Sequence, residues 1–125
     1  MDFDLKIGLK HSVEKVVAYK DTAASFGSGL VEVLATPVMI GVMEGTCAAC
    51  VQPYLPEGYS TVGTHVNVSH RASVAIDGTY FTACELIAID RKKLTFSVKT
   101  FTDEKTIGEG THDRFIINIS EFIKQ

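Results

Sequence analysis

The chain has 125 residues, a mass of 13.6 kDa and a formal net charge of −3 at neutral pH. Because domains most often have ~100–150 residues, we expect a single domain over residues 1–125. A sequence pI near 5.7 argues against a nucleic-acid-binding surface, which would need a basic stripe.

Three features of the sequence bear on where the protein works. The N-terminal segment M-D-F-D-L-K carries acidic residues where a signal peptide carries basic ones. No apolar run approaches the ~18 residues of a membrane span. The 3 cysteines do not form an even disulfide framework, which fits a reducing compartment. We therefore expect a cytoplasmic protein without membrane or nucleic-acid partners.

The N-terminal third predicts a strand followed by irregular structure. Residues 3–10 alternate weakly and indicate a short extended segment, and residues 11–20 place their apolar side chains on one face, as a strand does. Residues 21–29 are rich in Ser, Ala and Gly and predict a loop. We expect residues 30–35 to form a short helical turn or lid.

A long helix is predicted next. Thr36 suits the N-cap because its hydroxyl can accept from an unpaired backbone amide, and Pro37 suits the first helical position. Pro53 predicts the end near Gln52, because proline disfavours a helical residue before it. The resulting helix has about 16 residues and a length of roughly 24 Å.

This helix is apolar nearly all round, which is typical of a buried helix. Its single charge is Glu44, which has no polar helical neighbour one turn away. Burial of an ionised carboxylate without partners costs several kcal/mol, so Glu44 needs a solvent pocket or partners from elsewhere in the chain. The simpler alternative is a carboxylate at the helix edge that reaches water.

The rest of the chain alternates with the period of β-strands. Residues 61–72 place Val62, Thr64, Val66, Val68 and His70 on one predicted face, which should cover the helix, and Gly63, His65, Asn67, Ser69 and Arg71 on the other. Further strands are predicted at 79–90, around 94–98, and at 106–119. In the last of these, Gly108 and Gly110 indicate a bulge or a strong curl.

The predicted order is a strand, a buried helix and a four-stranded antiparallel meander. One flat sheet cannot cover a helix that is apolar all round, so the sheet must wrap around it. The fold class is therefore α+β, a hot-dog fold in which a curled antiparallel sheet wraps a long central helix. One side of the helix would remain exposed in a monomer, so we expect a homodimer, possibly a dimer of dimers.

Three separated motifs carry a family resemblance: A-T-P-V-M-I-G-V-M-E-G-T-C-A followed by P-Y-L, then V-G-T-H-V-N-V-S-H-R-A, and finally G-E-G-T-H-D-R. In this order and spacing, they resemble the fluoroacetyl-CoA thioesterase-like family, whose members have hot-dog folds. The resemblance runs from about residue 5 to residue 122. The chain departs from the family's fluoroacetate-specific member before Thr36, where F-G-S-G-L-V-E-V-L replaces a lid with aromatic residues.

The resemblance implies a set of site residues. Thr36, Glu44 and His70 match the family's catalytic threonine, glutamate and histidine. Gly63 matches a glycine whose backbone N–H contacts the thioester carbonyl or CoA, and Arg114 matches an arginine at the acyl site. The implied activity is hydrolysis of a small or short-chain acyl-CoA to the free acid and CoA, with CoA entering as part of the substrate and no separate cofactor or metal.

Thioester hydrolysis needs a nucleophile or activated water, a proton donor for the thiolate and a donor to the oxyanion. Glu44 can serve as a general base or attack directly to form an anhydride. His70 would orient or protonate, and Thr36 would hydrogen-bond the carboxylate or the water. Eight residues separate Thr36 from Glu44, about 12 Å along a helix, so these two cannot touch within one straight helix. Either Thr36 folds back before the helix or the site spans two subunits.

Several of these residues also have a purely structural interpretation. Without the resemblance, His70 reads as a core histidine, Thr36 as a cap and Gly63 as relief of strand curvature. Arg114 shares a strand face with His112, and a solvated arginine is the ordinary outcome. The pair Cys47 and Cys50 lies too far into the helix for a redox motif and lacks further zinc ligands, so we interpret both as core residues.

Two other functions remain open at this stage. A hot-dog enoyl-CoA hydratase or dehydratase also uses a helix carboxylate and a histidine, but there the histidine usually precedes the helix. A non-catalytic acyl-CoA-binding module would not need the Thr36, Glu44 and His70 set.

Overall fold

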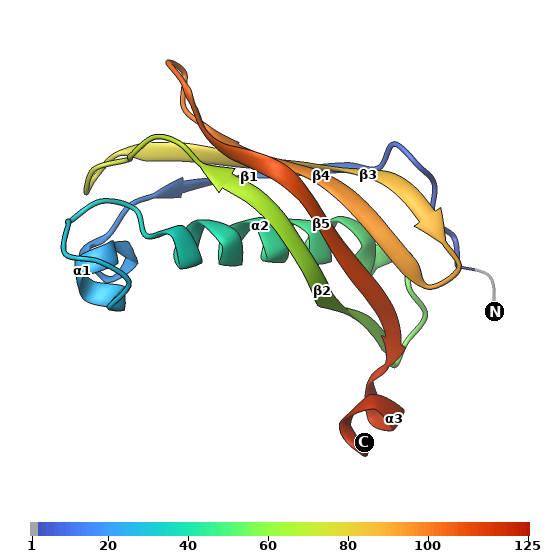
Figure 1. Ribbon diagram of the computed structural model, residues 1–125. Helices are drawn as coiled ribbons and strands as arrows, with labels where there is room; N and C mark the ends of the chain where they lie inside the picture. Colours follow the sequence, from blue (N-terminus) through green and yellow to red (C-terminus); the bar gives the residue numbers. More distant parts are fainter. Residues whose placement is uncertain (1–2) are drawn as a thin grey trace.

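A curled five-stranded antiparallel sheet arches over one side of a long helix in the computed structural model, which describes residues 3–125 (Figure 1). The predicted domain bounds of 1–125 include residues 1–2, which lie outside the described part. The strands are β1 (Lys10–Val16), β2 (Tyr59–His70), β3 (Thr79–Asp90), β4 (Lys93–Phe101) and β5 (Thr106–Asn118). The helices are α1 (Ala23–Phe26), α2 (Thr36–Val51) and α3 (Ile119–Ile123), with 3₁₀ turns at Tyr19–Asp21 and Gln52–Tyr54.

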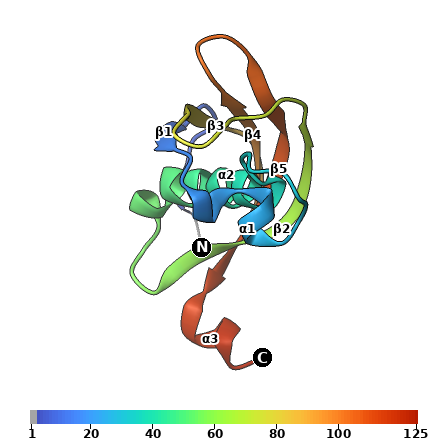
Figure 2. The same ribbon diagram turned by 90° about the vertical axis from the view of Figure 1, so that its left-hand side faces the viewer.

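The central helix α2 is the predicted one, displaced by one residue at its start. Ala35 is the N-cap, with extended backbone angles, and Thr36 is the first helical residue. The prediction that Thr36 caps the helix is therefore wrong, and its hydroxyl is free for another partner. Seen along the helix, the strands curve from β1 to β2 around α2 without closing (Figure 2). The hot-dog fold is confirmed.

The core lies between the concave face of the sheet and one side of α2. From the helix, Met39, Met43, Cys47 and Val51 are at most 1% exposed. The sheet contributes these buried apolar residues: Tyr80, Cys84, Leu86, Leu94, Phe96, Val98, Ile107 and Ile116. The opposite side of α2 is open, because Gly41, Gly45 and Ala49 are exposed.

The strand order is β1-β3-β4-β5-β2, which corrects the predicted four-stranded meander. Only β3, β4 and β5 follow one another as a meander. β2 pairs with β5 rather than with β3, and β3 pairs on its other side with β1. A connection over residues 71–78 carries the chain across the sheet, so β2 becomes an edge strand.

The segment before α2 also differs from its prediction. The helical turn lies at α1, where the Thr22 hydroxyl accepts from the Ser25 amide at 3.2 Å, and not at residues 30–35. Leu34 instead forms an isolated bridge with Thr22, and Val33 forms another with Ala75. A serine- and alanine-rich segment thus forms one capped turn, because a side-chain oxygen satisfies its first free amides.

A bulge in β2 reverses part of the predicted facing pattern. The β2–β5 register shifts between Gly63 and His65, so Thr64 is the extra residue. Directly paired residues share a face of the sheet. Gly63 pairs with Arg114, and His70 pairs with Gly108. Both therefore face α2, and the prediction that Gly63 lies opposite His70 is wrong. A second shift, between β4 and β5, leaves Ile107 as an extra residue next to Gly108, as the glycines of β5 indicate.

Within residues 3–125, the structure has no helix that is long and apolar enough to cross a membrane.

Candidate active site

Thr36 and His70 form the first of two polar clusters on the inner face. The first turn of α2 carries Thr36, and the end of β2 carries His70. The Thr36 Oγ1 lies 2.7 Å from the His70 Nδ1, so the hydroxyl bonds the imidazole instead of capping the helix. The His70 Nε2 is buried and has no hydrogen-bond partner among the described residues. A buried imidazole nitrogen without a partner is costly, and it marks a place where a ligand, a water or another chain is expected.

Glu44 and Arg114 form the second cluster, near the middle of α2. The Glu44 Oε2 lies 3.8 Å from the Arg114 Nη1, and the two side chains are 42% and 9% exposed. The carboxylate therefore has both a cationic partner and access to solvent. The sequence predicted that a charge on an apolar helix needs either a partner or contact with solvent. Glu44 has both, and its partner Arg114 comes from β5.

Arg114 is a buried and firmly held cation, and not the solvated arginine that is the ordinary outcome. Its Nε donates to the Thr61 Oγ1 at 2.8 Å and its Nη2 donates to the Thr61 carbonyl at 2.9 Å. Burial lowers the pKa of Arg114, and the nearby Glu44 carboxylate raises it. An arginine keeps its charge in proteins, so a fixed positive group stands beside the carboxylate.

Sequence reasoning did not include His112 in the site. This residue is 1% exposed, and its Nδ1 lies 2.8 Å from the His65 carbonyl oxygen. A carbonyl only accepts, so Nδ1 carries the proton, and the neutral ring then accepts at Nε2 from the Arg114 Nη1 at 3.1 Å. Burial lowers the pKa of His112, which favours this neutral form. The signal in the sequence was the spacing of His112 and Arg114 on one strand face.

Gly63 lies where these three side chains converge. A Cβ at this position would be 2.7 Å from the Glu44 Oε2, 3.1 Å from the His112 Cε1 and 3.4 Å from the Arg114 Nη1. The absence of a side chain leaves the space that the carboxylate occupies. Strand curvature is thus not the only reason for a glycine here.

The structure does not bring all five predicted site residues together within one chain. Thr36 pairs with His70, while Glu44 lies with Arg114 and Gly63. No hydrogen bond or ion pair between described residues joins the two clusters. Thr36 begins the helix itself, so it does not fold back, and about 12 Å of helix axis separates it from Glu44.

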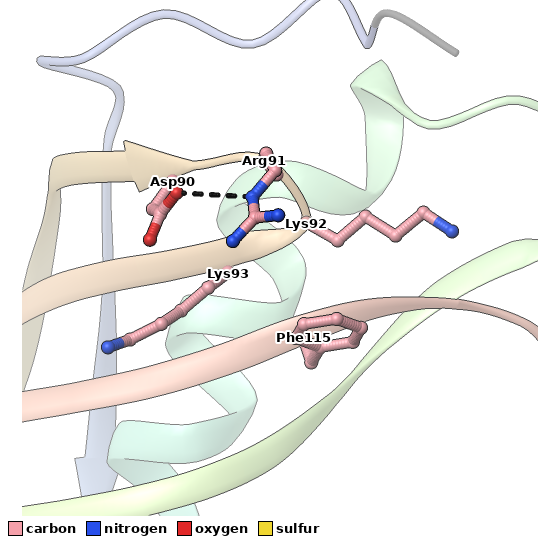
Figure 3. A pocket seen from close by; sticks show the side chains of 5 residues that line it. All are labelled: Asp90, Arg91, Lys92, Lys93 and Phe115. Atoms are coloured by element: carbon pink, nitrogen blue, oxygen red, sulfur yellow. Dashed lines mark ion pairs between the residues drawn. The ribbon is translucent and has the colours of Figure 1, made fainter.

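Cavities lie at both ends of the sheet. A shallow hollow of about 240 Å³ is lined by Val33, His70, Arg71, Ala72 and Ser73, beside the first cluster. A larger hollow of about 470 Å³ lies at the β3–β4 turn and is lined by Asp90, Arg91, Lys92, Lys93 and Phe115 (Figure 3). Phe115 occupies the face opposite Arg114, so the larger hollow is separate from the Glu44 cluster. Two of its cations are already paired, Arg91 with Asp90 and Lys93 with Asp113.

The three cysteines are free and buried in the core. Burial raises the pKa of Cys50 to about 12. The pKa of Cys84 is raised mainly by a hydrogen bond with Cys47 and further by burial. Protonated thiols are poor nucleophiles and poor metal ligands.

A curled antiparallel sheet around one long helix places this protein in the class of hot-dog folds. The family model described as fluoroacetyl-CoA-specific thioesterase (FlK) matches residues 17–120. The chain belongs to this family, and the resemblance of the three motifs is confirmed.

Individual relatives agree with this assignment. The fluoroacetyl-CoA thioesterase of Streptantibioticus cattleyicolor is 34% identical over 91 residues, which span 73% of this chain and 66% of that relative. A solved structure of the fluoroacetyl-CoA thioesterase FlK superposes with a TM-score of 0.91 at 28% identity, covering 96% of this chain and 93% of the other. A thioesterase superfamily member from Thermus thermophilus, at 22% identity, shares the fold with a TM-score of 0.87, covering 95% of this chain and 88% of the other.

Proposed function

We propose that this protein hydrolyses a small or short-chain acyl-CoA to the free acid and CoA. The observation that carries the proposal is the Glu44 carboxylate, partly open to solvent and 3.8 Å from a buried arginine, under a glycine that leaves it room. Point mutants of the related thioesterase FlK have been solved with acetyl-CoA, and with fluoroacetate and CoA, which supports a small acyl group on CoA as the substrate.

In the proposed reaction, Glu44 supplies the electron pair. As a general base it removes a proton from water, whose oxygen attacks the thioester carbonyl carbon; as a nucleophile it attacks this carbon itself and gives an anhydride that water then opens. In both routes the C–S bond breaks, and the thiolate of CoA takes up a proton. No oxidation state changes, so the proposal includes no cofactor besides the CoA of the substrate.

The remaining site residues have supporting roles in the proposal. The Arg114 charge stabilises negative charge near the acyl group, and the Gly63 backbone N–H donates to the thioester carbonyl or to CoA. The Thr36–His70 pair provides the proton for the leaving thiolate or orients the attacking water. The His70 Nε2 is the atom available for the proton transfer to the thiolate, because the Thr36 hydroxyl already bonds the His70 Nδ1.

The two clusters are too far apart in one chain to act on one thioester bond, so we propose a homodimer with Glu44 from one subunit and Thr36 and His70 from the other. Two surfaces support it. β2 is an edge strand that pairs with β5 on one side only, and the open side of α2 exposes the small residues Gly41, Gly45 and Ala49. A second copy would cover apolar surface that one chain leaves exposed.

Subunit complementation tests this arrangement. Glu44→Ala and His70→Ala are each expected to be inactive alone. In a mixed dimer of the two, one of the two sites regains both wild-type groups, so activity returns after the variants are unfolded together and refolded. If the mixture stays inactive although mixed dimers form, the site does not span the two subunits.

Release of free thiol from a panel of acyl-CoAs tests the proposed function itself. We expect turnover of acetyl-CoA or another small acyl-CoA, and the panel includes fluoroacetyl-CoA because the family is described by that substrate. Hydration of a crotonyl thioester without thiol release would instead identify a hydratase. Tight binding of acyl-CoA without turnover would identify a binding module.

A further inference from the structure

Two hydrogen bonds connect the backbone of β2 with two side chains of β5, and an ion pair continues from the second of these side chains to the carboxylate of α2. The His65 carbonyl accepts from the His112 Nδ1 at 2.8 Å, and the His112 Nε2 accepts from the Arg114 Nη1 at 3.1 Å. The same Nη1 lies 3.8 Å from the Glu44 Oε2. His112 is thus the only described side chain that bonds the nitrogen facing Glu44, since Thr61 holds the other two nitrogens.

We propose that His112 is a positioning residue for thioester hydrolysis: its neutral imidazole holds the Arg114 guanidinium against Glu44, and protonation of His112 releases it. The inference rests on the proposed function, since it assigns a residue to that same site. His112 acts through Arg114, because its hydrogen bonds among the described residues run to the His65 carbonyl and to Arg114 and not to Glu44.

The hydrogen bond between His112 and Arg114 depends on whether the His112 ring carries one proton or two. In the neutral ring with Nδ1–H, the Nε2 lone pair faces an arginine N–H, which is a favourable hydrogen bond. In the protonated ring both nitrogens are donors, so two N–H groups and two positive charges face each other at 3.1 Å. This repulsion pushes the Arg114 Nη1 from its place beside Glu44 and strains the two hydrogen bonds that Arg114 donates to Thr61.

The charged groups around His112 oppose one another. Burial is the largest effect and lowers the pKa of His112, and the positive charge of Arg114 on the same strand lowers it further. Three groups raise the pKa: the His65 carbonyl through its hydrogen bond, Glu44 on α2 and Asp113 on β5. On the β4 side, the directly paired residue is the uncharged Phe96, and on the β2 side it is Val66. The neutral form therefore prevails at neutral pH, and the contact is lost only in acid.

Two amide substitutions separate the two bonds of His112. In His112→Gln, the longer side chain places an acceptor near the former Nε2 and can bond Arg114, but it does not titrate. In His112→Asn, the shorter side chain keeps a donor near the former Nδ1 for the His65 carbonyl, but it cannot reach Arg114. The exposed His11 on β1 gives a matched control in His11→Gln.

The test is steady-state thiol release across pH for the dimeric wild type and these variants, with thermal unfolding as a check of folding. We expect His112→Asn to lose tenfold or more in kcat at pH 8 with KM changed by less than threefold. We expect His112→Gln and His11→Gln to stay within about threefold of the wild type. On the acid side, the fall in kcat should be less steep in His112→Gln than in the wild type. Equal kcat for the Asn and Gln variants, or the same acid limb in wild type and His112→Gln, would overturn the proposal.

A second readout needs neither turnover nor a variant. Nitrogen-15 spectra of the histidine rings distinguish the two neutral tautomers and the charged ring. We expect His112 to be neutral at pH 7 with its proton on Nδ1. A proton on Nε2, or a charged ring at pH 7, would overturn the positioning role even if the enzyme is active. A wild type that releases no thiol from any acyl-CoA would instead refute the proposed function, and the tautomer would still decide the contact to Arg114.

Discussion

Gly63→Ala isolates the space above the Glu44 carboxylate. The new methyl carbon would lie 2.7 Å from the Glu44 Oε2, whereas ordinary contact begins at 3.4 Å, so one of the two must move. The carboxylate yields most easily, because it ends a flexible side chain that is 42% exposed. A shift approaching 1 Å in a reacting group costs up to ~10²-fold in rate, so we expect kcat to fall by about ten- to a hundredfold.

Stability should respond much less than activity. The methyl is also 3.1 Å from the His112 Cε1, a tight contact, but alanine reduces the entropy of the unfolded chain and offsets about 0.4–1 kcal/mol of the cost. We therefore expect the free energy of unfolding to change by less than about 1 kcal/mol. Thiol release and urea unfolding are measured side by side. Gly29→Ala is the control, because its methyl would meet only the Ala23 Cβ, at 3.4 Å. Wild-type kcat in Gly63→Ala would refute the reasoning.

Four further predictions follow from single contacts. Thr36→Val removes the hydroxyl that bonds His70 but no helix cap, so kcat should fall while the free energy of unfolding drops by no more than one hydrogen bond, about 0.5–1.5 kcal/mol; a wild-type kcat would contradict the role of Thr36. Thr61→Val leaves the buried Nε of Arg114 without an acceptor and should cost about 1–3 kcal/mol in urea unfolding, and an unchanged midpoint would contradict that bond. With a pKa raised to about 12, the Cys50 thiol should react with a disulfide reagent only as fast as the protein opens, so rapid labelling of the native state would show that it is accessible. Burial lowers the pKa of His112 below its ordinary 6.5 in the folded state, so on acidification the unfolded chain takes up this proton before the folded chain does. The free energy of unfolding should therefore fall as the pH drops through about 6.5 toward the folded pKa. In His112→Gln, which lacks this titrating ring, the fall should be smaller.

The elements were predictable because their signals are local. The cap-and-proline pattern predicted α2 from Pro37 to about Gln52, and the structure has it over Thr36–Val51. Alternation predicted strands at 79–90 and 106–119, which match β3 and β5 closely. The wrap of the sheet around the helix followed from one apolar helix without a polar face. Each of these inferences needs only the residues of the element itself.

The pairing of strands was not predictable in the same way. Nothing in the alternation of 61–72 states that its partner is β5 rather than β3, because that pairing joins residues about fifty positions apart. The bulge at Thr64 carries no composition signal, yet it turns Gly63 to the side of α2. One unpaired residue thus decides that a glycine lies above the catalytic carboxylate candidate.

The candidate site shows the same division. Glu44 stood out because a charge on an apolar helix needs an explanation, and the resemblance to known thioesterases added Thr36, His70, Gly63 and Arg114. The bonds from Arg114 to Thr61 and from His112 to the His65 carbonyl depend on the β2–β5 register, so they became visible only in the structure. The roles of all five predicted residues remain predictions until variants are assayed.

The most direct measurement is kcat for thiol release by Glu44→Ala and by the wild type, on whichever acyl-CoA the wild type turns over best. The variant should keep its fold, because Glu44 is partly solvent-exposed and removing it leaves Arg114 with its bonds to Thr61 and His112. We expect turnover to drop to the background of uncatalysed hydrolysis. Wild-type turnover by a folded Glu44→Ala protein would show that the carboxylate on the central helix does not carry the reaction.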